Sequence, residues 1–268
     1  MEHARHSSLT ALERALRRDR VLVTLGLCLV LAPVWLWLAR ASLDMYGEMT
    51  GPSAWMMRAT WDATYTSLIF AMWTAMMAGM MLPSAAPAIL IFAQVTRGSA
   101  QPDRPVLRAH LFAVGYLVAW AGFSAAATAT QLVLARAAWL TPMMESASPW
   151  FAATLLCVAG AYQWTAAKRA CLDRCRAPAA WLALHWRPGA RGALWLGAAH
   201  GVYCVGCCWA LMLLLFAGGV MSLVWIAGLS LFVLAEKVGP HAPWLDRVTG
   251  AVLVLAGLAV AAASLVRG

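Results

Sequence analysis

Long stretches without charge decide the fold of this chain, and the clearest is residues 63–96, ATYTSLIFAMWTAMMAGMMLPSAAPAILIFAQVT. No residue between Asp62 and Arg97 is charged. A helix needs about 20 apolar residues to cross the ~30 Å hydrocarbon layer of a bilayer, so this stretch is long enough for one crossing. Pro83 and Pro87 predict a kink or an early end of this helix, because proline removes a backbone hydrogen bond.

Five further stretches share this character. They lie between Arg20 and Arg40, Arg108 and Arg136, Glu145 and Lys168, Arg191 and Glu236, and Arg247 and Arg267. The fourth is long enough for two crossings, with a turn at Gly218 and Gly219. Of the 268 residues 63% are hydrophobic and 12% are charged, about half the charged fraction of a soluble domain. We therefore predict an all-α polytopic bundle of about seven transmembrane helices.

The placement of Lys and Arg predicts the orientation of the bundle. With the N-terminus inside, only Arg40, Arg58, Arg136 and Arg267 of the 20 basic residues lie outside. The positive-inside rule thus favours an N-in, C-out protein of the bacterial inner membrane. Residues 1–20 form a basic cytoplasmic segment, either a short surface helix opened by a capping box at Thr10 or a frayed tail, and residues 21–268 form one membrane domain. The net charge of +9 indicates contact with anionic lipid, not with nucleic acid.

A stripe of metal-binding side chains marks the predicted span at 192–216. At ~100° per residue, the stripe brings together His200, Cys204, Cys207 and Cys208. Imidazole and thiolate suit Cu(I), Zn(II) or iron. Counting from Arg191 places the group from the middle of the membrane into its outer half. A single buried cysteine usually packs as a small hydrophobe, as expected for Cys28 and Cys157, but this combination favours a metal or redox role.

Methionines form a second stripe in the opening stretch. Met72, Met76 and Met80 share one helix face, and Met77 lies on the neighbouring face. Thioethers select Cu(I), although they also fill gaps between helices. Eleven of the 14 methionines lie in this span or in two predicted outer loops, near 40–64 and 136–148, together with acids such as Asp44 and Glu48. This distribution fits an outward-facing surface that captures a soft cation.

Two more cysteines lie in the predicted inner loop at 168–191. Cys171 and Cys175 would share one face of a helix, and basic neighbours such as Arg174 would lower the pKa of their thiols. Such thiolates could accept a metal or exchange disulfides, or the thiols could be idle in a reducing cytosol. Glu236 and Lys237 are most simply an interfacial pair, while a Glu236 facing the bundle would take part in proton or metal chemistry.

Several blocks together resemble a family of bacterial predicted metal-binding integral membrane proteins that share an uncharacterised domain. The blocks are MWTAMMAGMMLP at 72–83, YQWT at 162–165, CLDRCR at 171–176, GVYCVGCCW at 201–209 and Glu236-Lys237. The family pattern continues the second block with Thr-Pro-Leu-Lys, whereas this chain has Thr165-Ala166-Ala167-Lys168, which leaves the end of that helix open. The resemblance implies metal binding, with copper as the expected metal.

The leading hypothesis is a copper protein for acquisition, delivery or transport, with zinc or iron as alternative metals. In this hypothesis the outer methionines capture the ion, the methionine span receives it, and the His200 stripe holds it. Its expected partner is a periplasmic copper protein or metalloenzyme. A transmembrane thiol–disulfide relay, a metal-dependent membrane oxidase and a structural subunit remain alternatives.

Overall fold

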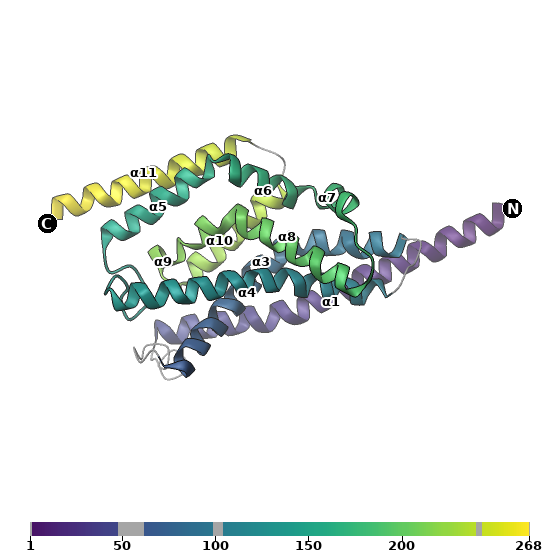
Figure 1. The fold of residues 1–268 in the computed structure, drawn as a ribbon, viewed down its shortest axis with the longest axis horizontal. Coiled ribbons are helices and arrows are strands. Elements are labelled where there is room, and N and C mark those ends of the chain that lie inside the picture. The colour runs from purple at the N-terminus through teal and green to yellow at the C-terminus, as the bar shows by residue number, and fades with distance from the viewer. Residues whose placement is uncertain (1, 48–61, 99–103, 240–242, 268) are drawn as a thin grey trace.

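The computed structural model describes residues 2–47, 62–98, 104–239 and 243–267, and within them the chain is helical apart from turns and one isolated β-bridge. The all-α prediction is therefore confirmed (Figure 1). The helices are α1 (Glu2–Met45), α3 (Ala63–Gly98), α4 (Pro105–Arg136), α5 (Pro149–Gln163), α6 (Ala166–Arg176), α7 (Pro178–His185), α8 (Gly189–Met212), α9 (Leu215–Gly218), α10 (Leu223–Val238) and α11 (Pro243–Arg267).

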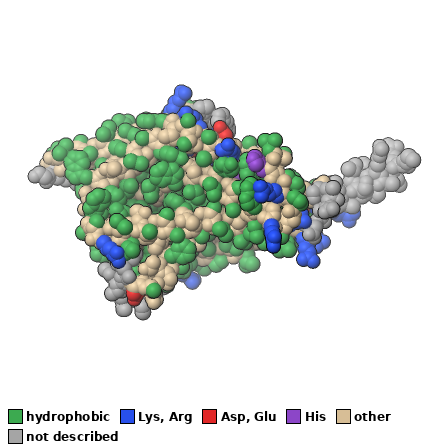
Figure 2. All heavy atoms as spheres, in the orientation of Figure 1, with side chains coloured by type: hydrophobic (Ala, Val, Ile, Leu, Met, Phe, Trp, Pro, Cys, Tyr) green, Lys and Arg blue, Asp and Glu red, His purple; other side chains and the backbone are tan. Residues whose placement is uncertain are grey.

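Five of these helical stretches are long and apolar enough to cross a membrane: 13–45, 63–98, 105–136, 189–218 and 244–266. The other two predicted crossings correspond to α5 and α10, which have 15 and 16 residues and are shorter than a typical span. Large apolar side chains are exposed around the described surface, among them Leu29 at 78% and Val224 at 81% (Figure 2). An apolar surface of this extent needs a nonaqueous environment, so the protein associates with a membrane.

Helix α1 runs unbroken from Glu2, so Thr10 lies inside the helix and does not begin it. Asp19 of α1 is buried and accepts two hydrogen bonds from the guanidinium of Arg97 of α3, each 2.6 Å long. A bidentate arginine–carboxylate pair fixes both distance and angle between two helices. Arg97 thus joins α1 to α3 in addition to marking the polar end of α3.

Helix α3 continues through Pro83 and Pro87 to Gly98, so the predicted early end is wrong. Proline at position 83 has no N–H to donate to the carbonyl of Gly79, four residues earlier. That carbonyl accepts a hydrogen bond from Trp35 Nε1 of α1 at 3.1 Å instead. The neighbouring helix therefore satisfies the group that the proline leaves free.

Helices α4 and α8 pack closely because a glycine of each helix lies against a backbone carbonyl of the other. A β-carbon at Gly115 would overlap the carbonyl of Leu194, and one at Gly197 would overlap the carbonyl of Phe112. Small residues let transmembrane helices approach closely, and this pair brings Tyr116 of α4 beside the middle of α8. Helices α5 and α11 form a second packed pair beside this bundle (Figure 1).

Candidate metal centre

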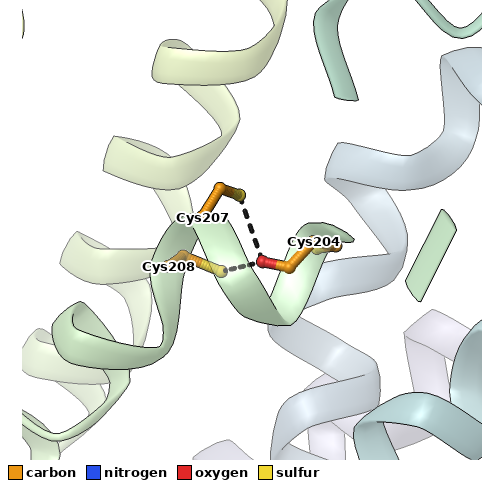
Figure 3. Close-up of side chains that lie close together, drawn as sticks. All are labelled: Cys204, Cys207 and Cys208. Atoms are coloured by element: carbon orange, nitrogen blue, oxygen red, sulfur yellow. Dashed lines mark hydrogen bonds between the residues drawn. The ribbon is translucent and has the colours of Figure 1, made fainter. Parts of the chain in front are cut away.

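Three cysteines on one turn of α8 form the centre of the candidate site. The sulfur atoms of Cys204, Cys207 and Cys208 lie within 4.8 Å of one another, and all three residues are at most 1% exposed. Figure 3 shows the Cys207 and Cys208 thiols directed at the carbonyl oxygen of Cys204, with distances of 3.1 and 3.0 Å. Spacings of three and four residues bring side chains to one face of a helix, so this grouping follows directly from the sequence.

This group has the dimensions of a metal site. Metal–sulfur bonds are about 2.3 Å long for zinc, so two sulfurs on one such ion are at most about 4.6 Å apart. The three sulfurs, all within 4.8 Å of one another, lie close to that limit. The hydrogen bonds that a bound ion would replace are weak, because thiols are poor donors.

Side chains of α10 and α4 contact the sulfur of Cys204, and α3 is joined to them through Lys237. Lys237 Nζ of α10 donates to Cys204 Sγ at 2.7 Å and to Ser84 Oγ of α3 at 3.0 Å. Tyr116 Oη of α4 lies 2.9 Å from the same sulfur. A buried ammonium beside a sulfur supplies the counter-charge that a thiolate needs in an apolar interior.

The prediction that Glu236 and Lys237 form an interfacial pair is wrong. Both are buried, at 1% and 8% exposure, and they face different neighbours. Lys237 is a candidate site residue that the sequence did not indicate, because a lysine ending an apolar helix ordinarily extends to the membrane surface. Its only sequence signal is the Glu-Lys pair itself.

Helix α6 brings two more thiols to this turn. Cys175 is buried in the same core cluster as Cys204 and Cys207, and the sulfur of Cys171 lies beside Gly206 of α8. We expected these two cysteines on the inner side, apart from a cluster reaching into the outer half of the membrane. That separation is wrong, because α6 packs directly against the cysteine turn of α8.

The basic neighbours of Cys171 do not lower its pKa as predicted. Burial raises the pKa of this thiol, and the nearby Cys207 raises it further. The charge of Arg174 acts in the opposite direction but contributes least of the three. The guanidinium of Arg174 instead lies 4.6 Å over the ring of Tyr203, which helps to hold α6 against α8.

Buried charges fix the position of α6. The break between α5 and α6 falls at residues 164–165 even without the family's proline, and the Thr165 side chain caps α6 by accepting from the backbone N–H of Lys168 at 3.2 Å. Lys168, expected at the inner surface, is fully buried and pairs with Glu236 of α10 at 2.5 Å. It also donates to Gln163, so the first turn of α6 is bound to both α5 and α10.

His200 is buried one turn before Cys204 but lies outside the group of three close sulfurs. Its ring packs among Phe112, Tyr116 and Trp181, with ring centroids 5.8–6.1 Å apart. Its Nδ1 atom has no hydrogen-bond partner within the described residues. A buried imidazole nitrogen without a partner is unusual and leaves an electron pair or a proton available.

The methionine stripe of α3 is also inside the bundle. Met72, Met76, Met77 and Met80 are at most 2% exposed. The backbone carbonyl of the next residue, Met81, accepts a hydrogen bond from Tyr116 Oη at 3.2 Å, and this hydroxyl also contacts Cys204. The backbone at the end of the stripe is therefore one side chain away from the Cys204 thiol.

Part of the predicted capture surface is not at the surface. Met45 and Met144 are buried, with exposures of 0% and 3%, and pack in the core. The carbonyl of Met144 accepts from the backbone of Val220, which ties its loop to the region before α10. Four further residues of that surface, Glu48, Met49, Met56 and Met57, lie outside the described residues.

A comparison of the chain with models of known protein families finds a match. A family model described as PpoB2, copper chaperone, matches residues 70–260, which include the methionine stripe, the cysteine turn and Lys237. No curated protein and no solved structure matches the chain.

Proposed function

The chain belongs to the PpoB2 copper chaperone family, and from this premise we propose that it is an integral membrane protein that binds Cu(I) and delivers it to a partner. Cys204, Cys207 and Cys208 hold the ion, and Cys175 completes the thiol group. The observation that carries this proposal is the set of three buried sulfurs within 4.8 Å of one another. Thiolates are soft ligands, the type that Cu(I) prefers.

The ligand type and the family support copper over zinc or iron as the cargo. Cu(I) bound by two of these cysteines as thiolates, with the others protonated, carries one net negative charge. The ammonium of Lys237, 2.7 Å from Cys204, neutralises it. Because uncompensated charge is costly in an apolar interior, this neutral arrangement is compatible with a buried Cu(I) site.

The methionine stripe and His200 provide a route for the ion inside the bundle. Met72, Met76, Met77 and Met80 offer neutral sulfur donors along α3, and the hydroxyl of Tyr116 separates the end of this stripe from Cys204. Weak thioether ligands suit an ion that must leave again. In the N-in orientation this route leads from the outer half of the bundle towards the thiols, and the acceptor is a copper protein or metalloenzyme.

Metal analysis of the purified protein tests this proposal. The wild type in detergent, loaded with Cu(I) under reducing conditions, should retain copper after gel filtration. The triple variant Cys204→Ser, Cys207→Ser, Cys208→Ser should lose it. The double variant Cys28→Ser, Cys157→Ser is the matched control, because it removes two thiols outside the site and should keep the wild-type copper content. Circular dichroism confirms that each variant is folded. Copper retained by a folded triple variant, or absent from the loaded wild type, would overturn the proposal.

A further inference from the structure

Cys171 differs from the other thiols around the α8 turn. Cys175, Cys204, Cys207 and Cys208 are buried, whereas Cys171 is half-buried and reaches the surface of α6. Its sulfur lies where position 206 of α8 has no side chain, since a β-carbon there would be only 2.7 Å away. Glycine at 206 thus allows a partly exposed thiol to lie directly against α8, next to the residue that precedes the buried Cys207.

The surface of α6 around Cys171 is charged. Arg174 acts on Cys171 and is exposed together with Arg169 and Asp173 of the same helix. A cavity of about 280 Å³ beside Leu172 is lined by Arg169 and Asp173 of α6 and by Asp246 and Arg247 of α11. Charged side chains at this density lie at a water-facing end of a membrane bundle and not among lipid tails. Cys171 is therefore accessible to a water-soluble molecule.

We propose that Cys171 is the exchange thiol of this protein, through which Cu(I) passes between an anionic Cu(I)–thiolate carrier and the buried cysteines. This inference rests on the proposed function. A carrier thiolate cannot reach Cys204 or Cys208, which are at most 1% exposed. Cu(I) held by two thiolates carries one negative charge, which the exposed Arg174, three residues after Cys171, attracts.

The transfer proceeds by three thiol exchanges without a change of oxidation state. In the first, the sulfur of Cys171 bonds to the copper of the carrier complex as one carrier sulfur leaves, and the proton of Cys171 passes to that departing sulfur. In the second, Cys207 bonds to the copper as the second carrier sulfur leaves, and the proton of Cys207 passes to that sulfur. In the third, the thiolate of Cys204 bonds to the copper as the bond to Cys171 breaks, and Cys171 takes up a proton from water. Delivery from the protein runs through the same steps in reverse.

The rate of copper exchange distinguishes an exchange thiol from a resident ligand. The purified full-length protein is loaded from the Cu(I)–glutathione complex and unloaded with bathocuproine disulfonate, and absorbance gives both rates. Cys171→Ser should leave the final copper content unchanged and slow both rates by about tenfold or more, because thiol exchange depends on access of the attacking sulfur. Cys157→Ser, a half-buried cysteine of α5, should exchange at the wild-type rate.

Gly206→Ala provides an independent test that retains every thiol. Its methyl group should turn the Cys171 sulfur away from Cys207 by rotating one flexible side chain, and exchange should again be slow. Wild-type exchange rates in Cys171→Ser would overturn the inference, as would a lost copper content, which would make Cys171 a resident ligand. A wild type that binds no copper would instead refute the proposed function.

Discussion

Lys237 and Cys204 form a charged contact in a place where neither side chain reaches solvent. The Nζ–Sγ distance is 2.7 Å, and the ammonium has a second acceptor in Ser84 at 3.0 Å. An isolated buried charge is costly, so the two groups stabilise each other's charged forms. Copper bound to Cys204 and a second thiolate would keep the same need for a positive neighbour.

Lys237→Met should therefore weaken Cu(I) binding without unfolding the protein. The variant replaces a buried charge by an apolar side chain of similar length, and Cys204 can become a neutral thiol. Hydrogen bonds to charged groups contribute about 1.5–3 kcal/mol, which predicts a Cu(I) affinity roughly 10- to 100-fold lower. Competition with a chromogenic chelator measures it. Ser84→Ala, which keeps the ammonium and removes its other acceptor, should change the affinity far less; equal affinities of Lys237→Met and wild type would contradict the prediction.

Residue spacing could predict only the local part of the site. Cys204, Cys207 and Cys208 are grouped by helical periodicity alone. The partners of Cys204 come from other helices: Lys237 lies 33 residues away and Tyr116 lies 88 away. Such pairings depend on how the helices pack, which a single sequence does not reveal.

At the scale of elements, α3 remains a helix through Pro83 because α1 supplies a hydrogen-bond donor. Trp35→Phe should remove that donor and leave the carbonyl of Gly79 unsatisfied, which costs about 1–3 kcal/mol. In a Pro83→Ala background the new backbone N–H can reach the same carbonyl, so Trp35→Phe should cost much less. The free energy of unfolding in detergent is measured for the wild type, Trp35→Phe, Pro83→Ala and the double variant. Trp37→Phe is the control on the same helix, and additive losses in the double variant would contradict this explanation.

The helices that could be located from the sequence are those that fill long charge-free stretches. Charge-free stretches of at least 19 residues placed α1, α3, α4, α8 and α11, because crossing a bilayer requires a helix of about 20 residues. Local sequence does not mark the break after α5, because residues 164–167 contain neither glycine nor proline, the residues that usually end a helix. From the sequence, Lys168 is expected to mark the polar end of a span. It is buried instead because Glu236, 68 residues later, neutralises its charge.

At the scale of the whole molecule, the chain begins and ends at opposite ends of the bundle. The start of α1 and the end of α11 point in opposite directions in Figure 1, whereas α7 and the start of α8 lie towards the end where α1 begins. An odd number of crossings follows if the bundle spans the bilayer along its length. Helix α7, which directly follows α6, then lies towards the compartment that also contains the N-terminus.

Reporter fusions to the full chain test this arrangement. The positive-inside rule predicts a cytoplasmic N-terminus, because 16 of the 20 basic residues fall in the sequence segments predicted to lie inside. A green fluorescent protein should fluoresce at the N-terminus and be dark at the C-terminus, where alkaline phosphatase should instead be active. The reverse pattern would invert the protein and place Cys171 outside, where an oxidising environment would oppose exchange by a free thiol. Two termini on one side would contradict an odd number of crossings, whereas the expected pattern assigns copper exchange at Cys171 to the reducing cytosol.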